Sequence, residues 1–183
     1  RQKYPQSQHQ ELPGQVLLPG LINLHSHAAM TVMRGLADDL PLMQWLNDRI
    51  WPTEQKHADA EMVYDGTLLA CAEMLLGGVT SFNDMYFFPD ASARAALTAG
   101  MRLTAGIVAI EFPNSYSSDA ADGLHKGLVT RDTYNGEALI NFSLAPHAPY
   151  TVSDATFKRI VTLAEQLDLS IHIHLHETQD EIK

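Results

Sequence analysis

The sequence predicts an α/β fold, in which helices cover a parallel β-sheet, and three observations support this prediction. Short segments that are apolar almost throughout alternate with longer segments in which apolar residues recur at helical spacing. The order reads β-α-β-α-β-α-β-α-β, and strands that are apolar on both faces are typical of parallel sheets. The chain has no G-x-G-x-x-G after its first strand and no G-x-x-x-x-G-K-[ST], which argues against nucleotide-binding versions of this architecture.

The first predicted strand lies in the apolar segment 16–24, after a turn at Pro19-Gly20, and we expect it to be short and buried. Before it, residues 1–15 contain few apolar side chains and are interpreted as a linker. The first predicted helix spans residues 58–76, where apolar residues recur at helical spacing, and Gly77-Gly78 ends it.

The rest of the chain continues the alternation of strands and helices. Asp90 is suited to cap one helix, Gly100 to end it, and Ser153 or Asp154 to cap another. Gly123 and Gly127 weaken the prediction of the helix between these two. In chain order, the predicted elements are a strand at 79–86, a helix at 91–99, a strand at 101–112, a helix at 120–128, a strand at 138–144, a helix at 154–167 and a strand at 169–175.

The composition excludes several classes of partner. The chain of 183 residues carries 12 Lys and Arg against 22 Asp and Glu, a net charge of −10. Such a charge argues against binding to nucleic acid or to an anionic membrane surface, but it leaves a small neutral substrate open. No apolar run approaches the roughly 20 residues that span a bilayer, and Cys71 has no second cysteine to pair with. We therefore expect a cytoplasmic protein, and a homo-oligomer is left open.

Two histidines, His25 and His27, stand at the carboxyl end of the first predicted strand. Side chains at positions i and i+2 of a strand project to the same side, so both imidazoles face one way. Active sites of parallel α/β proteins are built at this end of the strands. Two neutral imidazoles on one face form half of a metal site, although a coincidental pair is the alternative.

A second histidine cluster ends the last predicted strand, where His172, His174 and His176 alternate and Glu177 follows. The period of two again places the three imidazoles on one face, and burying them without partners is costly. A third ligand for the metal held by His25 would resolve that cost. A carboxylate beside a metal-activated water is suited to acid–base chemistry. The alternative is a polar core patch with one surface glutamate.

A third candidate is His147, between Pro146 and Pro149 after the strand at 138–144. The prolines restrict the loop backbone and would hold His147 in a defined direction. The pattern fits a substrate contact at the mouth of an active site, and it equally fits a rigid loop with an incidental histidine.

Several segments of the chain, these histidines among them, together resemble the amidohydrolase superfamily, in the branch of methylthioadenosine/S-adenosylhomocysteine deaminases and chlorohydrolase-like enzymes. The likeness runs from about Val16 to the last residue. The segments that carry it are Leu18 to His27, Met30 to Gly35, Trp45-Leu46, Trp51-Pro52-Thr53-Glu54, Asp84-Met85-Tyr86, Pro146 to Tyr150 and His174 to Thr178.

The resemblance implies a (β/α)8 TIM barrel of the metal-dependent hydrolase type, of which only about the first five β/α units are present. A complete barrel takes about 250 residues. Residues 16–183 would form the N-terminal part of this barrel, and residues 1–15 a linker from a small flanking β-domain. The family's sixth-strand histidine and eighth-strand aspartate would lie beyond Lys183, so the chain as given is expected to be inactive alone.

The resemblance also assigns roles to individual residues. His25, His27 and His174 match metal ligands, and Glu177 matches the glutamate that moves a proton between metal-activated water and the substrate ring. Glu54 matches a carboxylate that holds ribose hydroxyls, His147 matches a substrate contact, and His176 would line the pocket, whereas His172 would lie deeper in the barrel. The strand at 138–144 lacks the lysine of binuclear members, which implies one divalent metal ion, zinc.

The implied activity is the hydrolytic release of ammonia from methylthioadenosine or S-adenosylhomocysteine, a reaction at the C–N bond of a cyclic amidine. Residues 105–119 contain none of the arginines that some nucleoside deaminases of this branch place there, so the substrate is left open. The alternatives are dechlorination or deamination of a triazine or guanine-like ring, and a metal-binding fragment without catalysis.

Overall fold

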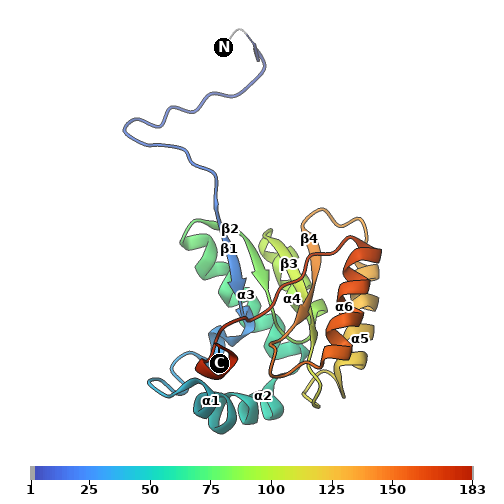
Figure 1. Cartoon of the computed structure of the whole chain (residues 1–183). Coiled ribbons are helices and arrows are strands. Elements are labelled where there is room, and N and C mark those ends of the chain that lie inside the picture. Colours follow the sequence, from blue (N-terminus) through green and yellow to red (C-terminus); the bar gives the residue numbers. More distant parts are fainter. Residues whose placement is uncertain (1–2, 183) are drawn as a thin grey trace.

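The computed structural model describes residues 3–182 of the chain and contains a parallel sheet of four strands in the order β1-β2-β3-β4 (Figure 1). The strands are β1 (Leu21–Ser26), β2 (Val79–Asp84), β3 (Arg102–Ala109) and β4 (Ile140–Pro146). The long helices are α3 (Ala60–Leu76), α4 (Pro89–Ala99), α5 (Ala120–Thr133) and α6 (Asp154–Leu167), which alternate with the strands along the chain. The predicted α/β architecture is confirmed.

The two faces of the sheet carry different side chains. Leu103 and Ile107 of β3 and Phe142 and Leu144 of β4 share one buried cluster with residues of the four long helices. Because strand residues alternate between faces, this face packs against the helices. On the other face, Val108 and other residues near the carboxyl ends of the strands belong to a second cluster. The long helices therefore cover one face of the sheet, and the second cluster lies on the other face, near the carboxyl ends of the strands.

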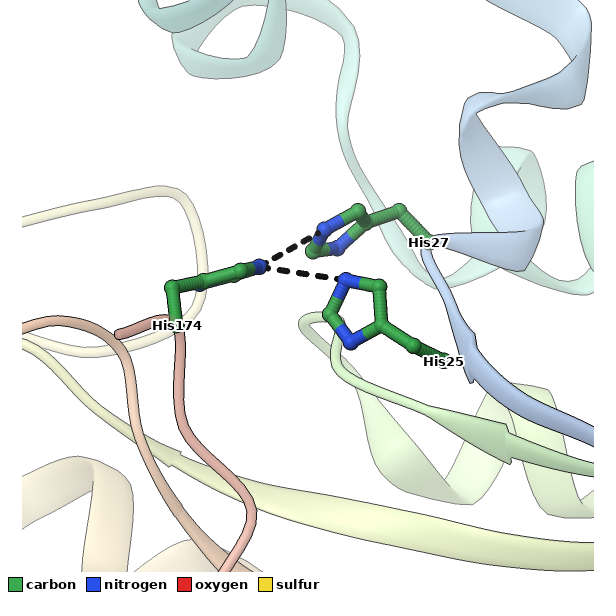
Figure 2. Close-up of side chains that lie close together, drawn as sticks. All are labelled: His25, His27 and His174. Carbon is green, nitrogen blue, oxygen red and sulfur yellow. Dashed lines mark hydrogen bonds between the residues drawn. The ribbon is translucent and has the colours of Figure 1, made fainter. Parts of the chain in front are cut away.

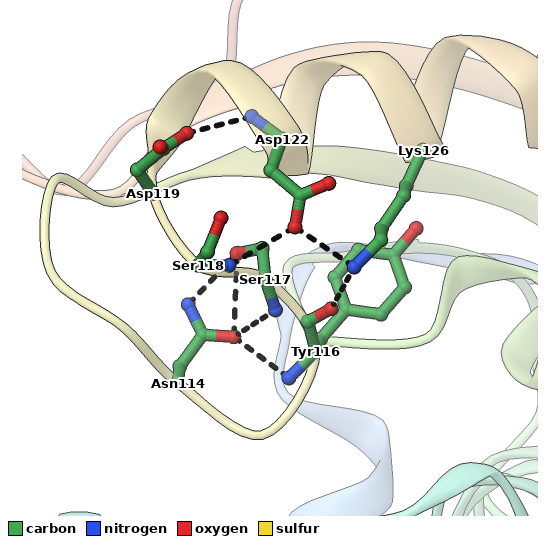
Figure 3. Close-up of polar contacts among 7 residues, drawn as sticks. All are labelled: Asn114, Tyr116, Ser117, Ser118, Asp119, Asp122 and Lys126. Atoms are coloured by element: carbon green, nitrogen blue, oxygen red, sulfur yellow. Dashed lines mark hydrogen bonds and ion pairs between the residues drawn. The ribbon is translucent and has the colours of Figure 1, made fainter.

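Three of the four long helices begin at a side chain that caps them, whereas α4 begins after Phe88 without such a cap, and the predicted cap Asp90 lies inside α4. The Asp59 side chain accepts from the backbone N–H of Met62 at the start of α3, and Ser153 caps α6 in the same way. Asp119 accepts from the backbone N–H of Asp122 at 2.8 Å and so caps α5 (Figure 3). Helix α5 continues to Thr133, five residues beyond the predicted end.

The loop before α5 is closed by its own polar contacts (Figure 3). Asn114 Oδ1 accepts from the backbone N–H groups of Tyr116 and Ser117, at 2.9 and 2.8 Å. Lys126 donates to Asp122 and to the carbonyl of Tyr116, both at 2.8 Å. The loop is thereby fastened to the first turns of α5.

Short helices that the sequence analysis did not predict fill the connection between β1 and α3. They are the 3-10 helix η1 (Ala28–Met33), α1 (Leu42–Trp45), the π-helical turn η2 (Leu46–Ile50) and α2 (Trp51–His57), and a last short helix is α7 (Gln179–Ile182). Helices α1 and α2 lie beyond the carboxyl ends of the strands (Figure 1). They bring Trp45, Trp51 and Glu54 to that end of the sheet.

The predicted strand at 169–175 is wrong as a regular strand. Only one isolated parallel bridge forms, between Ile171 and Leu144 of β4, and the segment continues without regular structure. The backbone N–H of His172 donates to Leu144 and that of His174 donates to His147, so the segment still follows β4. Within the described residues it pairs on one side only, which removes half of the hydrogen bonds that stabilise an inner strand.

The prediction that the first strand is buried is also wrong. Leu21, Ile22 and Leu24 of β1 are 63 %, 66 % and 73 % exposed. In the described chain β1 is an edge strand that pairs with β2 alone, so little packs against its side chains.

Residues 3–20 lie outside the described helices and strands, and Figure 1 shows the N-terminal segment running away from the sheet. The domain boundary at residues 15 and 16 stays a prediction. Among the helices of residues 3–182, none has the length and apolar character needed to cross a membrane.

Candidate metal centre

Three histidines from distant parts of the chain meet at the carboxyl end of the sheet. His25 is the next-to-last residue of β1, His27 directly follows the strand, and His174 comes from the segment that runs beside β4 (Figure 2). His174 Nε2 lies 3.1 Å from His27 Nε2 and 3.2 Å from His25 Nε2. The three residues thus offer ligand atoms that all lie within 4.8 Å of one another. The predicted metal ligands are brought together.

In each imidazole, the outer ring nitrogen is Nδ1, which does not face the other two histidines. The hydrogen bond of this nitrogen decides whether Nε2 carries a lone pair or a proton. His27 Nδ1 lies 2.7 Å from the carbonyl of Met85, and His174 Nδ1 lies 2.9 Å from the carbonyl of His147. A carbonyl only accepts, so both Nδ1 atoms carry the proton and donate. The Nε2 atoms of these two neutral rings then face each other with lone pairs and no proton between them.

This arrangement fits a bound cation. Two nitrogens that each lie about 2.0–2.1 Å from one tetrahedral zinc ion are about 3.3 Å apart, close to the separations seen among these rings. Burial, with a smaller contribution from the neighbouring His174, lowers the pKa of His27 to about 4. Burial and the neighbouring His27 also lower the pKa of His25. Neutral imidazoles are the form that binds a metal.

The end of β2 holds the His25-Ser26-His27 segment in place. Asp84, which is 2 % exposed, accepts from the backbone N–H of Ala28 at 2.7 Å and from the Ser26 hydroxyl at 3.1 Å. The next residue, Met85, donates its N–H to Ser26 and accepts from the His27 ring. Asp84 and Met85 therefore fix the backbone on both sides of His27. Sequence reasoning had noted Asp84-Met85-Tyr86 only as part of a resemblance.

A cavity opens beside this group of histidines, and His27 and His174 form part of its lining. Its apolar lining includes Trp45, Trp51 and Met30, and its polar lining includes Glu54 and Glu177. The mixture of apolar walls with a few polar groups is typical of small-molecule sites. The two tryptophans were named from the sequence only as part of a resemblance, and the structure places both in the cavity wall.

Glu54 is a buried carboxylate, only 8 % exposed, in the wall of this cavity. The hydroxyl of Tyr86 donates to Glu54 Oε1 at 2.7 Å. Burial raises the pKa of Glu54 to about 7, against the opposing effect of the Tyr86 hydrogen bond. Tyr86 was not singled out from the sequence as a site residue, because a tyrosine after a strand carries no spacing signal of its own.

Glu177 is exposed and also lines the cavity, where it accepts from the Tyr150 hydroxyl at 3.0 Å. His147 lines the cavity too, and its Nδ1 lies 3.0 Å from Thr151 Oγ1. Burial lowers the pKa of His147 to about 3, and the charges of His174 and His27 contribute. His176 is exposed, has a φ of 57°, and is not among the described residues that line the cavity.

Comparison with known proteins places these features in context. The model of the amidohydrolase family matches residues 16–183. The chain is 53 % identical to the 5-methylthioadenosine/S-adenosylhomocysteine deaminase of Saccharophagus degradans, over 98 % of this chain and 40 % of that protein. It is 42 % identical to the 5'-deoxyadenosine deaminase of Methanothermobacter thermautotrophicus, over 92 % of this chain and 39 % of that protein.

Among solved structures, the chain resembles an adenosine deaminase from Xanthomonas campestris with bound zinc. The TM-score is 0.86 and the identity 47 %, over 90 % of this chain and 37 % of that one. With the parallel sheet, this similarity confirms the fold class predicted from the sequence, part of a (β/α)8 barrel. The chain spans about two fifths of the length of the proteins to which it is similar.

Proposed function

This chain belongs to the amidohydrolase family, and we propose that it forms part of a zinc-dependent deaminase that removes the ring amino group of an adenosine-type nucleoside. The observation that carries the proposal is the group of three facing imidazoles beside a cavity with two carboxylates. The relatives named for methylthioadenosine, S-adenosylhomocysteine and 5'-deoxyadenosine support the substrate class. A cytoplasmic location and self-association stay predictions.

His25, His27 and His174 would hold the metal through Nε2. When bound, a divalent zinc ion supplies Lewis-acid chemistry and lowers the pKa of a coordinated water towards about 7. The hydrogen bonds from His27 to Met85 and from His174 to the His147 carbonyl keep these rings oriented for that purpose.

Glu177 is proposed to move a proton to the purine ring as the amino group leaves. It lines the cavity and is exposed, so it can exchange protons with water and substrate. Its hydrogen bond from Tyr150 would limit the rotation of the carboxylate and aim it at the ring. A positioned acid of this kind contributes roughly 10²–10⁴-fold to a rate.

Glu54 is proposed to bind the two ribose hydroxyls, since a carboxylate accepts from two neighbouring donors. Its burial beside Trp51 in the cavity wall strengthens such hydrogen bonds, because water does not compete. His147 would contact the substrate from the β4 end of the cavity. His176 stays a prediction as a substrate contact, since it lies outside the cavity lining of the described residues.

Release of ammonia, and of chloride from the chlorinated ring, by the zinc-loaded, full-length protein tests this function. The panel contains methylthioadenosine, S-adenosylhomocysteine, 5'-deoxyadenosine, guanine and a chlorinated triazine. We expect turnover of the adenosine nucleosides with kcat/KM well above that for the two other rings. Preference for guanine or triazine would overturn the substrate, and inertness towards the whole panel would favour a metal-binding chain without catalysis.

The role of Glu177 has its own test in the variant Glu177→Gln. The amide keeps the size of the side chain and loses the exchangeable proton, so kcat should fall by roughly 10²–10⁴-fold. Zinc content should stay that of the unmodified protein, because Glu177 is not proposed as a ligand. A variant that retains its kcat would remove Glu177 from the reaction.

A further inference from the structure

We propose that His172 positions the metal ligand His25 by accepting a hydrogen bond from its outer ring nitrogen. The inference rests on the proposed function only in assuming that the three histidines bind a metal. His172 Nε2 lies 2.7 Å from His25 Nδ1, the nitrogen that points away from the other two ligands. The two ring planes are inclined at 82°, so the rings are not stacked and the contact is between the two nitrogens.

Each of the three ligands has one partner for its outer nitrogen. For His27 and His174 that partner is a backbone carbonyl, which no substitution removes. For His25 it is the side chain of His172. His25 is also the exposed member of the group, so less packing holds its ring. His172 is therefore the support of the centre that mutation can test directly.

Counting protons assigns the role of acceptor to His172. His25 Nε2 faces His174 Nε2 at 3.2 Å, so a metal bound there takes the Nε2 lone pair of His25. The proton of the neutral His25 ring must then sit on Nδ1, and it points at His172 Nε2. His172 Nε2 accepts, and the proton of its own neutral ring is left on Nδ1.

The surroundings of His172 fit this assignment. His172 Nδ1 is buried and has no hydrogen-bond partner among the described residues. A buried polar atom without a partner is costly, and such atoms are found where a side chain is held for a function. Since Nε2 is occupied by His25, His172 is not a fourth ligand of the same ion through that atom.

The backbone of His172 provides a fixed base for this contact. Its N–H donates to the carbonyl of Leu144 at 2.9 Å, and the N–H of Leu144 donates to Ser170 at 2.9 Å. Leu144 is fully buried in the sheet. These hydrogen bonds to a buried strand residue hold the backbone of His172 in place. The side chain therefore starts from a fixed position, which is what a positioning residue requires.

The test compares two variants of equal length, His172→Gln and His172→Met, in the full-length protein. Glutamine places an acceptor oxygen near the position of Nε2, whereas methionine fills similar space with only a weak acceptor. The dissociation constant for zinc is measured by competition with a chelating indicator, without substrate. The melting temperature of the metal-free protein reports separately on the fold. His125→Met, at an exposed position of α5, is the matched control.

We expect the methionine variant to bind zinc roughly 10–100-fold more weakly than the unmodified protein. The glutamine and His125→Met variants should bind within a few-fold of it, and all metal-free proteins should melt at similar temperatures. Equal zinc affinity of the glutamine and methionine variants would overturn the role of His172 and leave the proposed function intact. Absence of zinc binding by the unmodified protein would instead overturn the metal centre itself.

If the methionine variant does not fold, His172→Asn takes its place. Its amide is one atom shorter and stops short of His25, while it remains polar. Weaker zinc binding by the asparagine variant than by the glutamine variant supports the proposal, and equal binding overturns it.

Discussion

Glu54 is a buried carboxylate in the cavity wall, and its surroundings raise its pKa. Its carboxylate is buried, and the hydrogen-bond donor that the described structure gives it, the Tyr86 hydroxyl, is neutral. A neutral donor compensates only part of the cost of burying a charge. That is why the pKa of Glu54 rises to about 7 instead of falling, as it would beside an arginine. The residue therefore links the proposed substrate binding to stability.

Glu54→Gln should make the protein more stable relative to the unmodified form as the pH rises. The carboxyl pKa is higher in the folded state, about 7, than its ordinary value of 4.5. The folded protein therefore holds an extra proton between these values, and its stability falls as the pH rises through them. From pH 5 to pH 8 the relative gain of the variant should be roughly 2–3 kcal/mol.

Urea unfolding of the metal-free protein at both pH values measures this difference. Glu61→Gln, at an exposed position of α3, is the control and should change stability by less than about 0.5 kcal/mol at either pH. The same relative stability of Glu54→Gln at pH 5 and pH 8 would contradict the argument. Weaker binding of the nucleoside by this variant is expected independently, through loss of the carboxylate.

At the scale of residues, the sequence allowed the meeting of the proposed ligands to be predicted better than the contacts that support them. The spacing of His25 and His27 at a strand end was enough to place both on one side. The same rule predicts that His172, His174 and His176 share a face, and here the irregular backbone intervenes. His174 reaches the metal-binding group, His172 contacts His25, and His176 turns away at a φ of 57°. Residue types in a sequence do not reveal such a local turn.

At the scale of elements, α3 and η1 approach each other closely at Gly66. A Cβ atom at Gly66 of α3 would collide with the backbone carbonyl of Ala29 in η1. Because η1 directly follows His27, this contact positions the segment that carries two of the proposed ligands. The close approach is possible because glycine has no side chain at position 66.

Gly66→Ala should therefore destabilise the protein by about 1–3 kcal/mol, although alanine is the better helix former by about 1 kcal/mol. The obstacle is backbone, which cannot rotate out of the way as a side chain can. Gly77→Ala at the end of the same helix is the matched control, since its Cβ would make only ordinary contacts at 3.4 and 3.5 Å. Urea unfolding distinguishes the two. A Gly66→Ala protein as stable as the control would disprove the close contact.

Glycines also explain where the prediction of elements fell short. Gly123 and Gly127 made the helix at 120–128 doubtful, yet α5 is regular to Thr133. A Cβ at Gly123 would lie 2.7 Å from the Val108 carbonyl, and one at Gly127 would collide with the Ile107 side chain. The glycines serve packing of the helix on β3, which local propensity does not register. For the segment 169–175 the error was the opposite, because a strand was predicted where no regular strand forms. Its apolar pattern is strand-like, but within the described residues it pairs on one side only.

At the scale of the whole molecule, both edges of the described sheet expose apolar side chains. On one side, β1 presents Leu21, Ile22 and Leu24. On the other, the segment beside β4 presents Ile171 and Leu175, which are 43 % and 60 % exposed. An unpaired parallel strand with exposed apolar residues offers free backbone groups and a hydrophobic surface to another chain. The net charge of −10 opposes association, but residues 21–26 and 169–175 contain no Asp, Glu, Lys or Arg.

A polypeptide limited to residues 1–183 should therefore self-associate in solution. Sedimentation velocity over a range of protein concentrations measures this, with oligomers or aggregates expected to grow with concentration. Leu21→Lys and Leu24→Lys place charge on the open strand and should shift the population towards monomer, because a charged edge disfavours strand pairing. Leu12→Lys, in the exposed N-terminal segment, is the matched control and should have little effect. A polypeptide that stays monomeric at every concentration would show that the exposed strand is not adhesive. An equal response to all three lysines would attribute the effect to net charge rather than to β1.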